Sequence, residues 1–483
     1  MPADELPPRF HLLTRLHDAL EREGSVSREA VAGVAASLRI PLAEAWEAAT
    51  SYPMFRFELG KPSETRCGGL SCALNGAAPS RDPSAGCRFR CFDAPVDGAE
   101  EPFPEERICL AGPLLADDVG DWKGLVTAQR QGTDAALDVI EAAGLRGRGG
   151  AYFPVATKWR GAIAQRRPIA LVVNAEEGEP GVFKDRALLQ RRPRRFIEGL
   201  AIAAAVLRPT VIVVFVNGEA APMREALTGA LRVSRALLPV EPLVVSGGGG
   251  YVLGEETTLL NALEGRKPVP RLRPPFPVES GLFGMPTVVN NVETIAQLSV
   301  VFRGEAGSFR SLGTQDAPGT KLFSLSGRVK RPGLYEMQLG SPLRELVEHA
   351  GGAIDGPVAA VLAGGPSGGF LPEAELDRLL LPGMMHATGA VAGSGGMVVL
   401  DSSSDLHAAV LAMAAFNADE SCGKCTPCRE GLPRLLSALQ GSEMGIGTDD
   451  LLEVVGLGSL CGLGQMAPGP IRSARHFWPE LFA

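Results

Sequence analysis

The sequence has no long uninterrupted hydrophobic run. Its most apolar window, residues 196–216, contains Glu198, Arg208 and Pro209, which the centre of a bilayer would tolerate poorly. The N-terminus, MPADELPP, lacks the basic start and the apolar stretch of a secretory signal. We therefore expect a cytoplasmic protein with no direct membrane insertion.

Clustered positive charge is scarce as well. The formal net charge of -8 argues against a nucleic-acid partner, because phosphate binding draws its affinity from clustered lysine and arginine. The arginine run QRRPRRF, residues 190–196, is expected to be a patch that faces solvent or another protein of the assembly. The six histidines lie outside every motif described below, so no imidazole catalysis is inferred.

Length and hydrophobic patterning predict an α/β multi-domain protein. A chain of 483 residues is too long for one hydrophobic core. Helical spacing dominates both ends, whereas strand-like apolar runs at residues 169–173, 210–216 and 242–246 alternate with helical patterns. The predicted segments are a helical bundle (residues 1–58), a loop-rich cysteine module (59–116), an α/β domain (117–318), a small α+β domain (319–400) and a helical C-terminal domain (401–483).

The nine cysteines favour metal ligation over disulfides, because their number is odd, they gather in two groups, and a cytosolic chain is expected. In ESCGKCTPCREG, Cys422, Cys425 and Cys428 are separated by two-residue gaps, and Cys461 follows in SLCGLG. Such a turn can fold three thiolates around a compact inorganic core that a distant fourth thiolate completes. The spacing favours a [4Fe-4S] cluster; zinc is the main alternative, although it generally uses two separated pairs.

The segment GLRGRGGAYFPVATKW contains a glycine loop, Gly147, Gly149 and Gly150, followed by Lys158. Glycines let the backbone approach a planar or phosphorylated ligand, and a lysine can neutralise a phosphate. The segment is neither a Walker loop nor a dinucleotide GxGxxG loop. Both a ligand loop and an ordinary loop fit this pattern.

A predicted strand in LVVNAEEGEPGVFKDR ends in the polar residues Asn174, Glu176, Glu177 and Glu179. Polar groups at the carboxyl end of a strand in an open α/β sheet lie where ligands bind. Acidic side chains at this point suit ribose hydroxyls and an amide. A solvated acidic loop is the alternative.

Two further segments carry polar residues in a glycine- and proline-rich setting. SGGGGYVLGEETTLLNALEG joins a glycine loop to Glu255 and Glu256 at the start of a predicted helix. RLRPPFPVESGLFGMPTVVNNVET places Phe276 on a proline-stiffened arm, and Asn290 and Asn291 side by side. Amide side chains are both donors and acceptors, which suits the edge of a flavin ring. Helix capping would explain either asparagine singly.

Taken in order, these four motifs closely resemble the NADH-binding flavoprotein subunit of respiratory complex I and its relatives in NAD-linked formate dehydrogenases and bidirectional hydrogenases. The resemblance runs from about Ala142 to the C-terminus. It implies a Rossmann-like FMN- and NADH-binding α/β domain, then a ubiquitin-like β-grasp domain, then a helical bundle that holds a [4Fe-4S] cluster. It also implies that hydride passes between nicotinamide and the flavin, which then exchanges single electrons with the cluster.

The resemblance also assigns binding residues. It implies that FMN is bound by Gly147, Arg148, Gly149, Gly150, Lys158, Asn174, Glu176, Glu177, Gly254, Glu255, Glu256, Val289, Asn290 and Asn291. It implies that NADH is bound by Phe153, Lys158, Glu179 and Phe276, and that Cys422, Cys425, Cys428 and Cys461 hold the cluster. This sequence departs from the family at Tyr152 and Ala156, where glycines are usual, at Glu176, where Asp is usual, and at Arg273, where Lys is usual.

The N-terminal part resembles the thioredoxin-like [2Fe-2S] subunit that accompanies this family. Residues 12–57 resemble its helical bundle, and CGGLSC and CRFRC resemble its paired cysteines, here Cys67, Cys72, Cys87 and Cys91. The interval between the pairs is too short for a complete thioredoxin sheet, so the appendage is a shortened one. A [2Fe-2S] cluster, zinc and a relic without metal all remain open. Cys109 is expected to be a buried thiol.

The function implied is that of a diaphorase subunit in a soluble NAD-dependent dehydrogenase. The fused N-terminal module favours formate dehydrogenase or hydrogenase over complex I, and the β subunit of a metal-dependent formate dehydrogenase comes first because hydrogenase versions are typically longer. Expected partners are a thioredoxin-like [2Fe-2S] subunit and a large molybdenum- or tungsten-containing iron–sulfur subunit. An electron-transfer scaffold without NAD binding is the alternative of another class.

Overall fold

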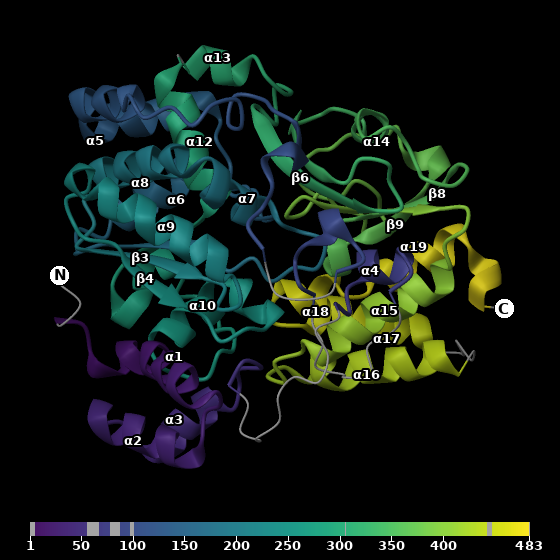
Figure 1. Ribbon diagram of the computed structural model, residues 1–483, viewed down its shortest axis with the longest axis horizontal. Coiled ribbons are helices and arrows are strands. Elements are labelled where there is room, and N and C mark those ends of the chain that lie inside the picture. The colour runs from purple at the N-terminus through teal and green to yellow at the C-terminus, as the bar shows by residue number, and fades with distance from the viewer. Residues whose placement is uncertain are drawn as a thin grey trace.

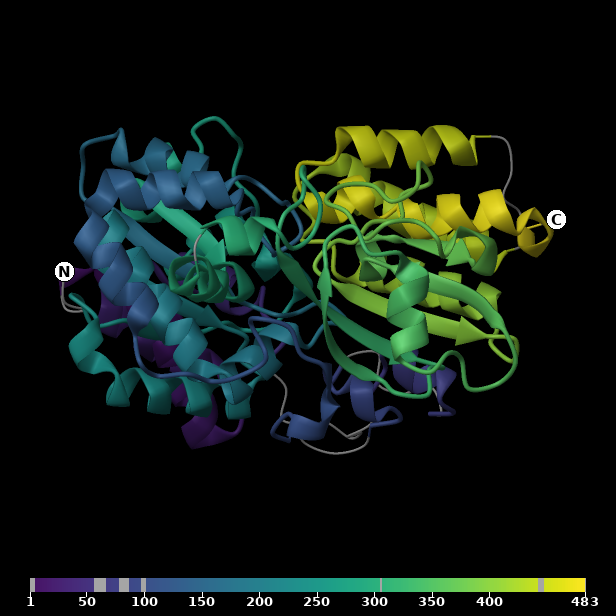
Figure 2. The ribbon, with the colours of Figure 1, turned by 90° about the horizontal axis from the view of Figure 1, so that it is seen from above.

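The structure, a computed structural model, describes residues 5–55, 67–77, 87–96, 101–304, 306–441 and 447–482. Two β-sheets, each with its own helices, lie side by side in one elongated molecule (Figure 1). The four-stranded sheet occupies the half that contains the N-terminal helices, and the six-stranded sheet occupies the half that contains the C-terminal helices (Figure 2). The predicted mixed α/β class is therefore confirmed. No described helix is long and apolar enough to cross a membrane.

The four-stranded sheet is parallel and buried on both faces. Its strand order is β4-β3-β2-β5. Alternate residues of β3 belong to two hydrophobic cores, with Ile212 and Val214 in one, and Val213 and Phe215 in the other. Apolar runs without a polar face are typical of such strands. The strands are β2 (Ala170–Ala175), β3 (Val211–Val216), β4 (Leu243–Ser246) and β5 (Thr287–Asn291).

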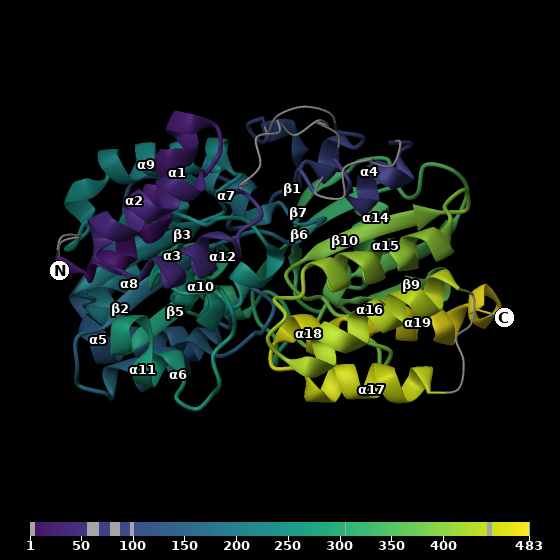
Figure 3. The ribbon, with the colours of Figure 1, turned by 90° about the horizontal axis from the view of Figure 1, so that it is seen from below.

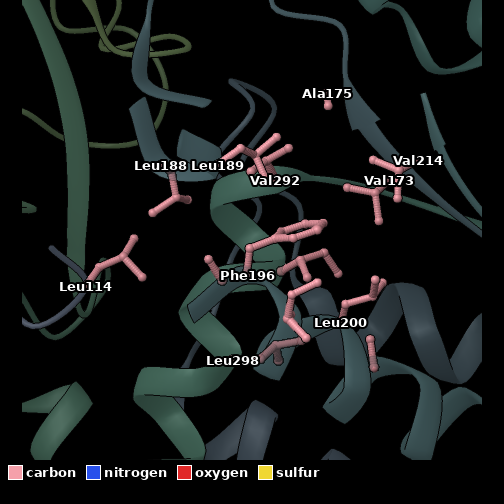
Figure 4. Packing of buried hydrophobic residues seen from close by; sticks show 14 of the residues in the cluster. Leu114, Val173, Ala175, Leu188, Leu189, Phe196, Leu200, Val214, Val292 and Leu298 are labelled. Atoms are coloured by element: carbon pink, nitrogen blue, oxygen red, sulfur yellow. The ribbon is translucent and has the colours of Figure 1, made fainter. Parts of the chain in front are cut away.

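Helices α8 (Pro193–Leu207) and α12 (Val292–Arg303) cover the first face of this sheet, and α5 (Lys123–Ala143) packs on them. Phe196 and Leu298 lie between the two helices and the strands (Figure 4). The helices touch at Gly199, where an added Cβ would lie 1.9 Å from a backbone carbonyl oxygen of α12. This contact requires glycine. Around these elements lie α6 (Val155–Ile163), α7 (Lys184–Arg191), α9 (Ala221–Val233), α11 (Pro277–Ser280) and α13 (Ala306–Arg310).

The second face is covered by the N-terminal helices together with α10 (Glu256–Leu263). Leu13 and Leu16 share one hydrophobic core with Phe215, and the His17 Nε2 lies 2.8 Å from the carbonyl oxygen of Gly247. The N-terminal bundle therefore has no core of its own, because its apolar sides close this face of the sheet. The helices are α1 (Leu12–Glu23), α2 (Arg28–Leu38) and α3 (Leu42–Ala49).

The six-stranded sheet is mixed, with strand order β1-β7-β6-β10-β8-β9. Its edge strand β1 comes from the segment predicted as a cysteine module and pairs in parallel with β7. Helix α14 (Leu343–His349) covers one face, where it packs on Val361, and the C-terminal helices cover the other, where Leu362 lies. The strands are β1 (Ile108–Leu110), β6 (Thr320–Gly327), β7 (Gly333–Gln338), β8 (Val358–Ala363), β9 (Gly369–Pro372) and β10 (Gly396–Asp401).

The C-terminal helices form a layer on the six-stranded sheet (Figure 3). The short helix α4 (Leu70–Leu74), from the cysteine module, contacts β6 and α15, and the Ser71 hydroxyl lies 2.9 Å from that of Ser326. Residues 56–66 and 78–86 of that module lie outside the described residues. The C-terminal helices are α15 (Leu406–Asp419), α16 (Thr426–Gln440), α17 (Thr448–Gly458), α18 (Gly462–Met466) and α19 (Gly469–Phe477).

Candidate functional site

Two of the predicted motifs meet where the parallel sheet changes direction. Asn174 near the end of β2 pairs with Asn291 at the end of β5. Strands β3 and β4 lie on one side of β2 and β5 lies on the other, so the chain leaves these neighbouring ends in opposite directions. Ligands of open α/β sheets bind at such a switch point.

The glycine loop lies directly on this point. A Cβ added at Gly149 would lie 3.1 Å from the Cβ of Asn291. Gly150 has a φ of +116°, and its added Cβ would lie 3.6 Å from the backbone of Gly393 and Ser394, before β10. The loop is therefore held between the two sheets at a separation that only glycine allows.

Lys158 and its neighbour Trp159 connect the loop helix α6 to β5. The Lys158 ammonium donates to the carbonyl oxygen of Val289 at 3.1 Å and to Glu256 at 3.3 Å. The Trp159 indole donates to the side-chain oxygen of Asn290 at 2.8 Å. The Lys158 side chain keeps 21% exposure, so its charge can also reach an anionic ligand.

The acidic loop after β2 is buried, and its carboxylates do different things. Glu177 accepts hydrogen bonds from the backbone N–H groups of Asp185 and Arg186 and so caps α7. Glu176 accepts from Asn217 through one oxygen only, and its Oε2 is buried without a hydrogen-bond partner among the described residues. The solvated-loop alternative therefore does not describe these residues.

Glu179 lies between the two sheets. Its Oε2 accepts a hydrogen bond of 2.6 Å from the hydroxyl of Ser394, and a Cβ at Gly365 would lie 2.3 Å from its Oε1. That Oε1 is buried and has no hydrogen-bond partner in the described part of the chain. Because Ser394 and Gly365 flank strands of the six-stranded sheet, both halves of the molecule form the surroundings of Glu179.

Glu255 completes this group of carboxylates. Its Oε2 accepts from the backbone N–H groups of Thr257 and Thr258 and caps α10, whereas its Oε1 is buried without a hydrogen-bond partner among the described residues. The Asn174 amide donates to the carbonyl oxygen of Gly254 at 2.9 Å, which joins this loop to β2. Free carboxylate oxygens beside close-packed glycines fit a ligand rich in hydroxyl and amide donors, as FMN is.

Burial raises the pKa of Glu176 to about 8 from an ordinary value of 4.5. Burial likewise raises the pKa values of Glu177 and Glu179 to about 7. Each folded-state pKa lies above its unfolded value, so the folded chain binds the proton more tightly. The stability present below the unfolded pKa is lost as the pH rises towards the folded pKa.

This shift predicts a pH-dependent loss of stability without ligand. From about pH 5 to pH 8 the free energy of unfolding should fall, by at most roughly 1.4 kcal/mol per pH unit for each such group. Glu176→Gln should flatten this slope, which urea unfolding at pH 5, 6.5 and 8 would measure. Glu225→Gln, on the exposed side of α9, is the matched control and should leave the slope unchanged. Parallel slopes for Glu176→Gln and the wild type would contradict the assignment.

Three residues in this region differ from what the sequence alone indicated. The Arg148 guanidinium is buried and donates to the backbone oxygens of residues 146, 318 and 320, so only its backbone faces the switch point. Lys184 and Glu293, which the sequence analysis missed, form a buried ion pair of 3.2 Å beside Asn291. The basic residue of the VFKDR sequence was the available signal for Lys184.

The two phenylalanines expected to stack on NADH are both exposed at the surface. Phe153 is 50% exposed and Phe276 is 49% exposed, which is unusual for large apolar side chains and leaves ring faces free for a ligand. Tyr152 has a φ of +51°, a conformation that normally favours glycine, and its ring packs with Ala317 and Leu339. The added bulk at Tyr152 therefore points inward and leaves Phe153 free.

The four C-terminal cysteines surround one cavity. Cys422, Cys425, Cys428 and Cys461 line about 270 Å³ free of protein atoms. Among the described residues, no three ligand-type side chains converge closely enough to hold a single metal ion, which disfavours zinc and fits a larger multi-atom cluster. Burial raises the pKa of Cys428 to about 11, so cluster assembly at this site would release thiol protons.

A single 3-10 turn, η6 (Tyr251–Gly254), joins this cavity to the switch point. Val252 lines the cavity, and Gly254 accepts the hydrogen bond from Asn174. Tyr251 donates its backbone N–H to Glu420, two residues before Cys422, and its hydroxyl lies 2.7 Å from that of Ser367. At roughly 2 Å of rise per residue, this turn keeps the two sites close.

The four N-terminal cysteines are buried together on the other side of the acidic loop. The Sγ atoms of Cys87 and Cys91 lie 3.7 Å apart, and the Cys67 thiol contacts those of Cys72 and Cys87. Backbone N–H groups of Arg88 and Phe89 point at Cys67 and Cys87. A row of thiols in contact fits two irons better than one central ion. The Cys109 thiol lies apart from these four, 3.9 Å from the carbonyl oxygen of Pro332.

Comparison with known families agrees with this arrangement of sites. The Nuo51 FMN-binding domain profile matches residues 140–300, and the SLBB domain profile matches residues 322–371. The NADH-ubiquinone oxidoreductase-F iron-sulfur binding region matches residues 408–483, and the thioredoxin-like [2Fe-2S] ferredoxin profile matches residues 6–82. Each predicted cofactor therefore has a matching family segment.

Relatives and solved structures point to the same family. The second F-type NADH-quinone oxidoreductase protein of Rhizobium meliloti (strain 1021) is 41% identical over 388 residues, 75% of this chain and 92% of that protein. The F-type protein of the NADH-quinone oxidoreductase of Mycobacterium tuberculosis (strain ATCC 25618 / H37Rv) is 40% identical over 389 residues, 75% of this chain and 87% of that protein. The crystal structure of an NAD+-reducing [NiFe]-hydrogenase in the H2-reduced state matches with a TM-score of 0.87 and 29% identity, covering 99% of this chain and 93% of that chain.

The family resemblance predicted from the sequence is thereby confirmed. The chain belongs to the F-type family of NADH-quinone oxidoreductase proteins, and it is an NAD-dependent oxidoreductase with an FMN-binding domain, a [4Fe-4S] region and an N-terminal thioredoxin-like [2Fe-2S] domain.

Proposed function

We propose that this chain is the diaphorase subunit of a soluble, multi-subunit NAD-linked dehydrogenase. It exchanges hydride between NAD(H) and FMN at the switch point and electrons with a [4Fe-4S] cluster in the cysteine cavity. One observation carries the proposal: η6 touches both places, with Gly254 at the switch point and Val252 at the cavity. Bound FMN would supply the chemistry that no side chain here offers, because it accepts electron pairs and releases single electrons.

The FMN site of this proposal uses the residues gathered at the switch point. Gly147, Gly149 and Gly150 bring backbone N–H groups against the ligand, and Lys158 neutralises the phosphate. The buried oxygens left free on Glu176 and Glu255 accept from ribityl hydroxyls or ring N–H groups. The proposed FMN residues that complete the site are the backbone of Arg148, and Asn174, Glu177, Gly254, Glu256, Val289, Asn290 and Asn291.

NADH binds over this site in the proposal. The exposed rings of Phe153 and Phe276 offer stacking faces, and Lys158 reaches the nucleotide phosphates. The free Oε1 of Glu179 accepts a hydrogen bond from the nicotinamide amide. These contacts orient the ring, and orientation contributes much of the rate acceleration in hydride transfer.

Phe276→Ala should raise the KM for NADH about tenfold and change the FMN content little, because the variant removes a stacking face worth roughly 1 kcal/mol or more. The measurement is dye reduction by NADH with the purified, FMN-loaded chain. Leu272→Ala is the matched control, since Leu272 lies on the same arm and is 72% exposed. No dye reduction by the FMN-loaded wild type would instead favour the scaffold function.

The terminal reaction belongs to a partner in this proposal. Formate oxidation by a molybdenum- or tungsten-containing subunit was preferred because of chain length, but the chain spans 93% of the matched hydrogenase chain, so length does not separate the two. That match also extends over the N-terminal module, and hydrogen is therefore the second candidate substrate. A thioredoxin-like [2Fe-2S] subunit is a further proposed partner. Metal analysis of the co-purified assembly, for molybdenum or tungsten against nickel, distinguishes the two substrates.

A further inference from the structure

The N-terminal cysteine site touches the acidic loop region through one aromatic ring. Phe89 lies between Cys87 and Cys91, and its backbone N–H donates to the Sγ of Cys87 at 3.3 Å. It has a φ of +56°, which is rare for phenylalanine and turns the residue away from an ordinary loop path. The position of the ring is therefore tied to the position of the thiols.

The ring of Phe89 lies against the guanidinium of Arg186, whose central carbon is 4.1 Å from the ring centroid. Arg186 is buried, with 3% exposure. A buried cation needs compensation, and an aromatic face supplies part of it. Arg186 thus faces the cysteine module with one side of its guanidinium plane.

On the other side, Arg186 holds the acidic loop. Its Nη1 donates to the carbonyl oxygen of Glu177 at 2.7 Å and lies 3.4 Å from the carboxylate of Glu177. That carboxylate in turn accepts from the first backbone N–H groups of α7. A continuous series of contacts therefore runs from Cys87 through Phe89 and Arg186 to Glu177, between two predicted cofactor sites.

A second contact in the same interface has no such connection. Phe92 packs edge-on against Phe183 at 5.0 Å and against Phe103 at 4.7 Å, all through apolar surface. This packing attaches the module to α7 without contacting a charged group of the loop. It supplies an internal control for the role of Arg186.

We infer that Arg186 is a positioning residue for the flavin loop, and that Phe89 makes its position depend on metal occupancy of the four N-terminal thiols. Filling that site fixes Cys87 and Phe89, and the fixed ring holds Arg186 and Glu177 in the arrangement that FMN meets. Coupling of this kind is reciprocal, so FMN also favours the filled cysteine site. The inference rests on the proposed FMN site at the acidic loop.

The test measures FMN affinity by flavin fluorescence titration of the full chain. Phe89→Leu and Arg186→Lys should each weaken FMN binding by about 3- to 30-fold, the range of a desolvated cation–π contact. Phe89→Tyr, which keeps the ring, and Phe92→Leu, which leaves Arg186 untouched, should remain within about twofold of the wild type. Hydrogen exchange in residues 184–191 should rise in the first pair alone.

The decisive arm removes the metal. Chelator-treated wild type should bind FMN as weakly as Phe89→Leu does, and chelation of Phe89→Leu should add little, because both changes break the same series of contacts. Additive losses, or equal affinities for the wild type and Phe89→Leu, would overturn the inference. If the metal-filled wild type binds no FMN at all, the proposed function fails instead, so the two failures are distinguishable.

Discussion

Gly199→Ala is expected to lower the free energy of unfolding by about 3 kcal/mol or more. The added methyl group would lie 1.9 Å from the carbonyl oxygen of Ile295 and 2.7 Å from its carbon, both backbone atoms. Backbone cannot rotate away as a side chain can, so α8 and α12 must separate and loosen the core that contains Phe196. Urea unfolding followed by far-UV circular dichroism measures the change.

Gly229→Ala is the matched control for this prediction. Gly229 also lies in a helix, α9, but an added Cβ would meet nothing within 4 Å. The same substitution should therefore stabilise the chain by roughly 0.5–1 kcal/mol, through helix propensity alone. Equal effects at Gly199 and Gly229 would mean that the contact between α8 and α12 is looser than described.

Cys425→Ser is expected to remove about four iron atoms and a similar amount of labile sulfide per chain, because a serine oxygen replaces one of four thiolates. Cys425 is the N-cap residue of α16, and serine is a favoured N-cap, so the helix should stay intact. Iron and sulfide analysis after anaerobic reconstitution measures the loss, and the signal of a reduced cluster in electron paramagnetic resonance should disappear with it.

Cys109→Ser provides the control for loss of a thiol as such. Cys109 is partly buried beside Pro332, outside both groups of cysteines. Its iron content should match that of the wild type, as should its FMN content. Unchanged iron in Cys425→Ser would show that the cavity does not hold a cluster through this residue.

Much of the sheet architecture was readable from the sequence. The apolar runs 169–173, 210–216 and 242–246 correspond to β2, β3 and β4, because strands buried on both faces need continuous apolar residues. Strand β5 was not predicted. Its sequence, TVVNN, is short and ends in two asparagines, so periodicity alone could not separate it from a loop.

The N-terminal part of the chain was harder to interpret. Its helices were predicted correctly, but the expectation of a separate bundle was wrong, since residues such as Leu16 pack against the parallel sheet. An amphipathic helix shows which of its sides is buried, not what covers that side. Strand β1 was missed for a related reason: three residues with no partner in the local sequence give no signal.

At the site, motifs located the residues but not their contacts. Glycines at 149 and 150 and the asparagine pair meet at the switch point as the motif order implied. Asn290 and Asn291 also have structural work: Asn290 accepts from Trp159 and Asn291 caps α12. The inward direction of Arg148 depends on the loop's path around Gly150, which no residue spacing reveals.

The sharing of one core between the N-terminal helices and the parallel sheet limits how this protein can be shortened. A version without α1, α2 and α3 would expose the side of the sheet on which Val172, Val213 and Phe215 lie. Such a surface is sticky in water, because uncovered β-sheet of this composition associates with other chains. The first three helices thus serve as the back wall of the nucleotide-binding half, and any functional trimming must leave that wall standing.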